Sequence, residues 1–228
     1  YDEIIDAVAT GFSDAESAGG SHCAILLDSV RHWGRDAAET VLDAAESHPH
    51  DRVIGFGLGG SETPPLEDFV EHFERARSIG LRCVVHAGET GAGEDVRKAV
   101  SVLSVERVAH GIRAIESREA LEAVRSQRVP LDLAITSNYR TRVTRGRHPI
   151  RDLIDEGIMV TLSTDDPSLF RTDPIREYRR ARRFGDLSTN ELFTVALNGI
   201  EASFASNRRK EELRAELETR RHNYEVNS

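Results

Sequence analysis

The sequence has few cysteines, no long apolar run and no net positive charge, and each of these absences excludes a class of protein. Its two cysteines, Cys23 and Cys83, are isolated, which argues against a disulfide framework or a Cys-x-x-Cys metal site and suits a reducing cytoplasm. No apolar run approaches the roughly 18 residues of a membrane span. Lys and Arg number 30 against 39 Asp and Glu, for a net charge of −9. Because nucleic-acid binding needs a basic surface, we expect neither a nucleic-acid nor a membrane partner.

Apolar, β-forming runs alternate with helical patterns throughout the 228 residues. The predicted strands cover residues 24–27, 53–58, 82–86, 107–111, 130–135 and 158–163. The predicted helices cover residues 1–18, 36–45, 66–79, 95–103, 118–126, 150–156, 190–203 and 208–221. Such regular alternation predicts an α/β fold with a parallel sheet.

Polar residues gather at the carboxyl ends of these predicted strands. A closed (β/α)8 TIM-type barrel turns all its strand ends to one mouth, whereas an open doubly wound sheet concentrates its site at one switch point. The barrel is therefore the favoured fold. It needs eight strands and about six are present, so we expect residues 1–228 to form a single barrel domain that lacks its first two strands. The helices within residues 190–228 should pack on that barrel, with 208–221 mostly solvated.

The segment from Val84 to Glu89 carries the clearest chemical signal. His86 stands at the end of a predicted buried strand, and Glu89 follows across a turn that Gly88 permits. An imidazole and a carboxylate at a strand end suggest a metal ligand beside a proton-transfer group. The alternative is a packed histidine beside a solvated glutamate.

Two later strand ends extend this signal. From residue types alone, His86, His110 and Asp165 could form a two-histidine, one-carboxylate metal site with an open water position. Glu89 and Asp166 then remain for proton transfer and substrate binding. Adjacent carboxylates repel unless a cation lies beside them. The alternative for Asp165-Asp166 is a helix amino-terminal cap, since Pro167 follows.

Several stretches match one known family in order and spacing. They are Val85-His86-Ala87-Gly88-Glu89, Ala109-His110-Gly111, Thr136-Ser137-Asn138, Ser163-Thr164-Asp165-Asp166-Pro167, Leu58-Gly59-Gly60-Ser61-Glu62, Arg31-His32 and Ala202-Ser203-Phe204. With them the sequence resembles the adenosine deaminase-like family of metal-dependent, amidohydrolase-type purine deaminases over nearly its whole length. The resemblance implies a hydrolase that deaminates an adenine-type purine nucleoside to the 6-oxo product and ammonia.

The resemblance also implies roles for individual residues. His86 and Asp165 would bind one Zn²⁺ per active site. Glu89 would protonate ring nitrogen N1. His110 would help deprotonate and orient the metal-bound water, which revises the ligand role that residue types alone suggested.

Two further residues would hold the purine by the same resemblance. Asp166 would make a hydrogen bond at N7, and the amide of Gly60 would reach N3, a close approach that glycine permits. The cytidine-deaminase type of zinc site needs a Pro-Cys-x-x-Cys pattern, and neither cysteine lies in one.

One departure from the family pattern is large. The family's first strand carries a His-x-His pair that supplies two more zinc ligands. The only such spacing here, His48 and His50, lies in a helix-to-strand turn at the other end of the barrel. We therefore expect the His-x-His segment to be missing from this sequence or supplied as a separate chain, and these 228 residues alone neither to hold zinc tightly nor to deaminate. The alternative is a catalytically inactive barrel used as a binding protein.

Arginines crowd two segments of this acidic chain. They are Arg140, Arg142, Arg145 and Arg147 after one predicted strand, and Arg171, Arg176, Arg179 and Arg180 after the last. Barrel loops at these positions often hold a phosphate, which arginine suits. One interpretation is a substrate with an anionic group away from the purine, such as aminodeoxyfutalosine or an adenine nucleotide, in place of adenosine or adenine. The other is that these arginines are solvated or paired with surface acids.

Overall fold

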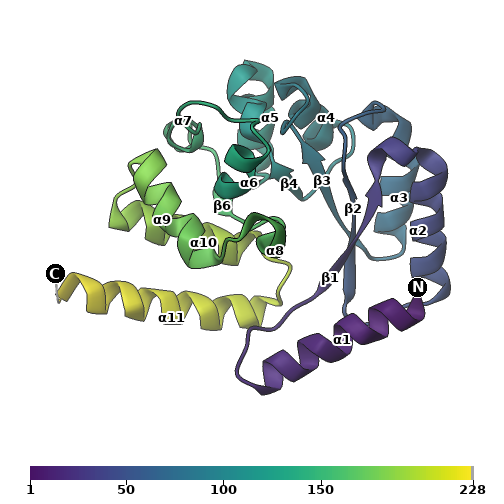
Figure 1. The fold of residues 1–228 in the computed structure, drawn as a ribbon, viewed down its shortest axis with the longest axis horizontal. Coiled ribbons are helices and arrows are strands. Elements are labelled where there is room, and N and C mark those ends of the chain that lie inside the picture. The colour runs from purple at the N-terminus through teal and green to yellow at the C-terminus, as the bar shows by residue number, and fades with distance from the viewer. Residues whose placement is uncertain (227–228) are drawn as a thin grey trace.

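The computed structural model describes residues 1–226, which form a curved parallel sheet with helices on its outer side (Figure 1). The strands are β1 (Ile25–Val30), β2 (Val53–Gly59), β3 (Arg82–Ala87), β4 (Arg107–His110), β5 (Leu131–Leu133) and β6 (Val160–Leu162). The helices are α1 (Asp2–Ser17), α2 (Arg35–Ser47), α3 (Val70–Ser78), α4 (Gly93–Ser101), α5 (Arg118–Gln127), α6 (Ile135–Arg140), α7 (Ile150–Asp155), α8 (Pro167–Phe170), α9 (Pro174–Gly185), α10 (Thr189–Ala202) and α11 (Asn207–Val226). Short 3-10 turns, η1 (Arg31–Trp33), η2 (Leu66–Phe69) and η3 (Ile112–Glu116), complete the connections.

The six strands pair in sequence order, every pair parallel. Each strand is followed by a helix that returns to the amino end of the sheet, as parallel pairing requires. This order and curvature are those of a (β/α)8 barrel with six of its strands, which confirms the predicted fold class. The carboxyl ends of all six strands consequently meet at one edge.

The core lies between the outer face of the sheet and the helices. Side chains on that face, including Phe56, Val85 and Leu131, are fully buried. Helices α2 to α5 follow one another around this side (Figure 1).

The concave face of the sheet is polar. Arg107 on β4 donates to the Asp132 carboxylate on β5 at 2.6 Å, and Thr161 on β6 donates to the same carboxylate. Below them the Phe204 ring stacks under Arg107, whose guanidinium carbon lies 5.5 Å from the ring centroid. This ionic layer joins three neighbouring strands inside the barrel, beneath the strand ends.

The structure corrects several predicted boundaries. Residues 130–135 were expected to form one strand, but β5 ends at Leu133 and Ile135 begins α6. The apolar run misled because a buried helix start has the same composition as a buried strand. Helix α9 was not predicted. Strand β1 continues to Val30, beyond the predicted end at Leu27.

The carboxyl-terminal helices lie against the last strand. Helix α10 packs on β6, where Asn198 donates to the Val160 carbonyl at 3.0 Å. Helix α11 packs on α10 through ion pairs such as Arg214 with Glu201. It buries no residue and is solvated along most of its length. Residues 227 and 228 of the predicted 190–228 region lie outside the described residues. Within residues 1–226 no helix has both the length and the apolar character needed to cross a bilayer.

Candidate active site

The sequence-predicted residues come from the ends of four of the six strands. His86 is the penultimate residue of β3, and Glu89 lies in the turn that follows it. His110 ends β4 and Asp165 follows β6, while Gly60 follows β2. Because all six strands are parallel and lie in one curved sheet, these positions meet at the same mouth.

Three of these side chains converge closely. Ligand atoms of His86, Glu89 and His110 all lie within 4.8 Å of one another. His110 Nε2 lies 3.6 Å from Glu89 Oε2 and 3.8 Å from Asp165 Oδ2. The centroids of the His86 and His110 rings are 5.1 Å apart. The cluster is partly shielded from water, because His110 is buried and Glu89 and Asp165 are largely covered.

The backbone at this mouth is strained. His110 and Asp165 adopt φ angles of 64° and 53°, in the left-handed region that residues with a side chain rarely enter. Such conformations persist where the surrounding structure imposes them, and they concentrate at functional sites. By strand alternation His110 would point away from the concave face, and the positive φ redirects it toward Asp165.

The turn that carries Glu89 is held by a buried carboxylate. Glu62, from the loop after β2, accepts the backbone N–H groups of Gly88, Glu89 and Thr90 at 2.7, 2.7 and 2.8 Å. Gly88 has φ 68°, and a Cβ there would lie 2.4 Å from Val96 Cγ2, so only glycine fits. Glu62 ends the stretch from Leu58 that resembles the family, but the sequence gives no sign that it holds the turn after β3.

Burial shapes the protonation of the cluster. Burial raises the pKa of Glu89, with Asp165 and Glu62 adding to the rise and His86 opposing it. A carboxyl with a raised pKa is suited to donate a proton near neutral pH. Burial, assisted by His86, lowers the pKa of His110 to about 4. At neutral pH His110 is therefore a neutral imidazole.

The two predicted substrate-binding residues flank the cluster. Gly60 has φ 83°, and a Cβ there would lie 3.0 Å from His32 Nδ1 and 3.2 Å from Val30 Cγ1. Asp166 precedes α8 but its side chain makes no capping hydrogen bond. The capping interpretation of Asp166 therefore does not account for its carboxylate, which is exposed at the mouth.

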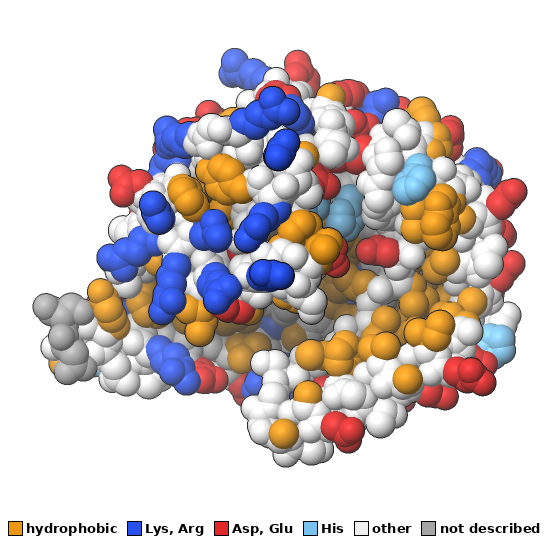
Figure 2. Space-filling view, in the orientation of Figure 1, with side chains coloured by type: hydrophobic (Ala, Val, Ile, Leu, Met, Phe, Trp, Pro, Cys, Tyr) orange, Lys and Arg blue, Asp and Glu red, His pale blue; other side chains and the backbone are white. Residues whose placement is uncertain are grey.

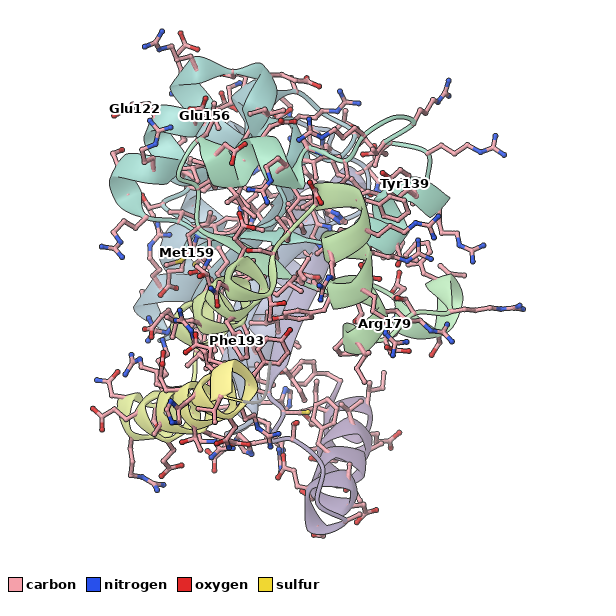
Figure 3. The ribbon with its side chains drawn as sticks, turned by 90° about the vertical axis from the view of Figure 1, so that its left-hand side faces the viewer. Glu122, Tyr139, Glu156, Met159, Arg179 and Phe193 are labelled. Carbon is pink, nitrogen blue, oxygen red and sulfur yellow. The ribbon has the colours of Figure 1, made fainter. Side chains whose placement is uncertain are left out.

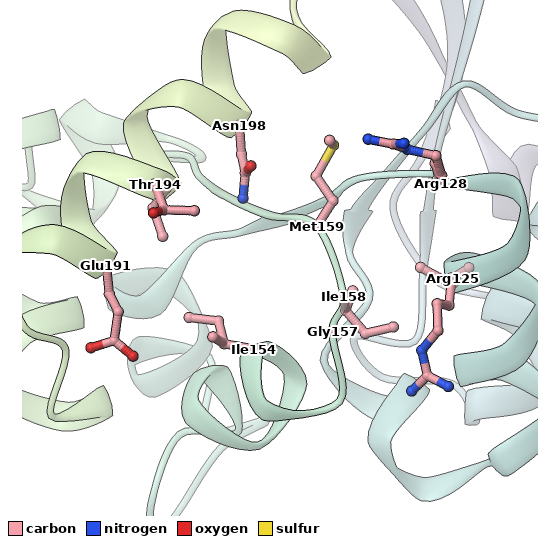
Figure 4. A pocket seen from close by; sticks show the side chains of 11 residues that line it. Arg125, Arg128, Ile154, Gly157, Ile158, Met159, Glu191, Thr194 and Asn198 are labelled. Atoms are coloured by element: carbon pink, nitrogen blue, oxygen red, sulfur yellow. The ribbon is translucent and has the colours of Figure 1, made fainter. Parts of the chain in front are cut away.

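A cavity of about 230 Å³ opens on the concave face beside these residues. Its lining includes His86, His110, Asp165 and Asp166, together with Asp28 on β1. A larger cavity of about 530 Å³ lies between α5, α7 and α10, lined by residues such as Met159 at the amino end of β6 (Figure 4). That cavity is at the opposite end of the sheet, where barrels place stability rather than chemistry.

The donor set suits a transition metal. Imidazole nitrogens and carboxylate oxygens are zinc ligands, and His86, Glu89 and His110 offer such atoms within 4.8 Å of one another, with Asp165 beside His110. His48 and His50 precede β2 at the other end of the sheet, with His48 Nε2 3.5 Å from Asp2 Oδ2.

Two buried residues behind His110 were missed as functional candidates. Asn138 on α6 bonds to His110, and His148, before α7, bonds to Asn138. Asn138 is part of a quoted family motif. His148 had only one signal, a lone histidine before Pro149 and a helix, which sequence reasoning alone does not distinguish from an ordinary loop residue.

Arginines surround one side of the mouth. Figure 2 shows Lys and Arg side chains gathered beside the central hollow, in which His and acidic side chains are visible. In Figure 3 Tyr139 of α6 and Arg179 of α9 lie on one side of the molecule, and Glu156 and Met159 lie on the other. Among residues 1–226, Arg147 pairs with Asp152 and Arg176 with Asp173. The other six arginines of the two predicted groups make no ion pair there.

The family model described as adenosine deaminase matches residues 1–220. An adenosine deaminase of Vibrio vulnificus is 33% identical over 215 residues, which cover 93% of this chain and 65% of that protein. An aminodeoxyfutalosine deaminase of Streptomyces avermitilis is 36% identical over 221 residues, covering 95% and 62%. This chain thus spans about two thirds of the length of these relatives.

Solved structures of related deaminases and amidohydrolases have the same fold. An adenine deaminase from Arthrobacter aurescens superposes with a TM-score of 0.87 at 31% identity, covering 93% of this chain and 65% of that one. An amidohydrolase from Burkholderia ambifaria with bound Zn superposes with a TM-score of 0.85 at 27% identity, covering 94% and 61%. A metal at the mouth is thus in keeping with the fold and with the donor set. By its family match, its relatives and its strand-end residues, the chain belongs to the adenosine deaminase family.

Proposed function

We propose that the protein is a zinc-dependent hydrolase that removes the 6-amino group of an adenine-type purine as ammonia. The observation that carries the proposal is the convergence of His86, Glu89 and His110 within 4.8 Å, with Asp165 3.8 Å from His110, at parallel strand ends. A binding scaffold needs neither a buried acid with a raised pKa nor a strained histidine beside it.

His86 and Asp165 would hold the zinc. A catalytic zinc usually takes at least three protein ligands, so we propose that two further ligands, a His-x-His pair, come from outside these 228 residues. That segment would also add the two strands that complete the barrel around residues 1–228, as one domain on which the helices of 190–228 pack. This chain spans 65% of the length of the adenosine deaminase of Vibrio vulnificus, which supports a further segment of this kind.

Each reacting group has a partner at the mouth. A zinc held by these residues would lower the pKa of water to about 7 and so supply the nucleophile. Glu89 donates its proton to ring nitrogen N1, which makes C6 electrophilic. His110 and Asp165 orient the attacking water. The C6–O bond forms and the C6–N bond breaks. One proton of the water goes to the departing amino group, which leaves as ammonia, and the other returns to Glu89.

Gly60 and Asp166 would orient the purine. The Gly60 amide reaches N3 because no Cβ stands in the way. Asp166, whose side chain makes no cap to α8, bonds N7 with the hydrogen on the carboxyl side, because N7 has only a lone pair. The two contacts fix the ring with C6 toward the cluster. We assign the reaction to the cytoplasm, since Cys23 and Cys83 are both free thiols.

We further propose that the substrate carries an anionic group away from the purine. Arg140 and Arg142 follow β5 and make no ion pair within residues 1–226, so they remain available for a phosphate or carboxylate. Aminodeoxyfutalosine or an adenine nucleotide then fits better than adenosine or adenine.

The test is ammonia release by the zinc-loaded full-length protein from adenosine, adenine, aminodeoxyfutalosine and AMP. Turnover of at least one of them, lost in Glu89→Gln and kept in the control Glu94→Gln, supports the proposal; Glu94 is an exposed partner of Arg97. Binding of purines without turnover by the zinc-loaded protein would favour an inactive binding barrel.

A further inference from the structure

A continuous hydrogen-bond chain runs behind His110. The Ile150 backbone N–H lies 3.2 Å from His148 Nδ1, and His148 Nε2 lies 3.0 Å from Asn138 Oδ1. Asn138 Nδ2 lies 3.2 Å from His110 Nδ1. His148 and Asn138 are fully buried and His110 is 3% exposed. Water therefore does not compete for these groups, and each must satisfy its neighbour.

The direction of the chain follows from its first member. A backbone N–H can only donate, so His148 Nδ1 is an acceptor and, in a neutral imidazole, the hydrogen is on Nε2. Burial lowers the pKa of His148 to about 4, which keeps it neutral at neutral pH. His148 Nε2 then donates to the Asn138 oxygen, and the Asn138 amide nitrogen must donate to His110 Nδ1. The reversed amide would set two donors against each other at His148.

We propose that His148 is a positioning residue, which through Asn138 fixes His110 in the tautomer with its hydrogen on Nε2. That nitrogen faces Glu89 Oε2 at 3.6 Å and Asp165 Oδ2 at 3.8 Å. An N–H directed at the Asp165 carboxylate is attracted by it, whereas a lone pair would be repelled. The backbone N–H of Ile150, on α7, thus determines which ring nitrogen of His110 carries the hydrogen, acting through the side chains of His148 and Asn138.

The tautomer defines what His110 can do. With Nδ1 occupied by Asn138 and a hydrogen on Nε2, neutral His110 has no free lone pair toward the mouth. It therefore donates a hydrogen bond to an oxygen there, and it is not a metal ligand in this state. This consequence for catalysis rests on the proposed deaminase function, whereas the tautomer itself does not.

The test is long-range ¹H–¹⁵N NMR of full-length protein labelled at histidine, with the His110 signals assigned by their loss in His110→Gln. Wild type should show a protonated Nε2 and an unprotonated Nδ1 at His110, and the opposite pattern would overturn the proposal. This spectrum needs no variant of the hydrogen-bond chain, so it decides even if such variants fold poorly.

Asn138→Asp tests the direction. A carboxylate only accepts, so the hydrogen of His110 should move to Nδ1, while bound zinc does not fall and kcat falls about 10²–10⁴-fold with KM changed less than about threefold. Asn198→Asp removes the amide on α10 that donates to the Val160 carbonyl of β6; it is the control and should leave the His110 spectrum unchanged.

The outcomes separate the two proposals. An active deaminase with His110 protonated on Nδ1 would overturn the tautomer assignment and leave the function intact. A protein with the assigned tautomer that deaminates no purine would overturn the function and leave the hydrogen-bond chain intact. An Asn138→Asp protein that keeps the hydrogen on Nε2 would refute the role of Asn138.

Discussion

Replacing Glu62 with glutamine should weaken the protein more than any ordinary surface substitution. The Glu62 carboxylate accepts three backbone N–H groups from the turn that carries Glu89, at 2.7 to 2.8 Å. Glu62 is 8% exposed, so solvent screens these bonds little. Glu62→Gln has nearly the same shape but can present only one acceptor oxygen.

The magnitude follows from the bonds. If the amide oxygen takes the place of Oε1, Glu89 and Thr90 keep their partner, but each bond loses its charge and about 1 kcal/mol. The Gly88 N–H then faces an amide NH₂ and is left unsatisfied, which costs about 1–3 kcal/mol. The sum is a loss of about 3–5 kcal/mol in the free energy of unfolding.

Urea unfolding followed by circular dichroism at pH about 7 measures the loss. The control is Glu106→Gln, whose carboxylate also accepts a backbone N–H, from Cys83, but at the amino end of β3 and 35% exposed. It should cost only about 1 kcal/mol. A Glu62→Gln protein as stable as Glu106→Gln would refute the reasoning.

Further predictions concern the reaction and its pH range. In the full-length enzyme Glu89→Gln should lower kcat about 10²–10⁴-fold with zinc content unchanged; a rate within threefold of wild type would remove Glu89 from the mechanism. His86→Ala should lose zinc, measured by metal analysis, as well as activity, and full zinc occupancy would contradict its role as a ligand. Arg140→Ala should lower kcat/KM roughly 10- to 150-fold for an anionic substrate and leave adenosine unaffected; equal losses would sink the anionic-substrate proposal. Because burial lowers the pKa of His148 from 6.5 to about 4, the unfolded chain binds the proton first, so stability holds above pH about 6.5 and falls toward pH 4. In His148→Phe the urea midpoint should fall less steeply than in wild type as the pH is lowered from about 6.5 to about 4. An equally steep fall in the two proteins would contradict this assignment.

The sequence was enough to predict the fold class and the members of the cluster. Alternation of apolar runs and helical patterns is imposed by parallel pairing itself, so it is visible without coordinates. His86, Glu89 and His110 were identifiable because reactive side chains at strand ends share one mouth once the strands are parallel. Their 4.8 Å convergence is the geometric result of that register.

What the sequence did not reveal depends on contacts between distant segments. Glu62 holds a turn more than twenty positions away, and nothing in its neighbourhood marks it as an acceptor of three backbone groups. His148 looks like a loop residue until α6 and α7 bring it against Asn138. The start of α6 at Ile135 was predicted as strand, because a fully buried segment lacks the pattern of polar residues that distinguishes a helix from a strand.

We expect this mouth to bind zinc and to deaminate a 6-aminopurine. The most direct measurement is ammonia release by the full-length protein before chelation, after removal of metal, and after zinc is restored. We predict that activity disappears with the metal and returns with about one zinc per chain. Activity that survives complete removal of metal would contradict the account.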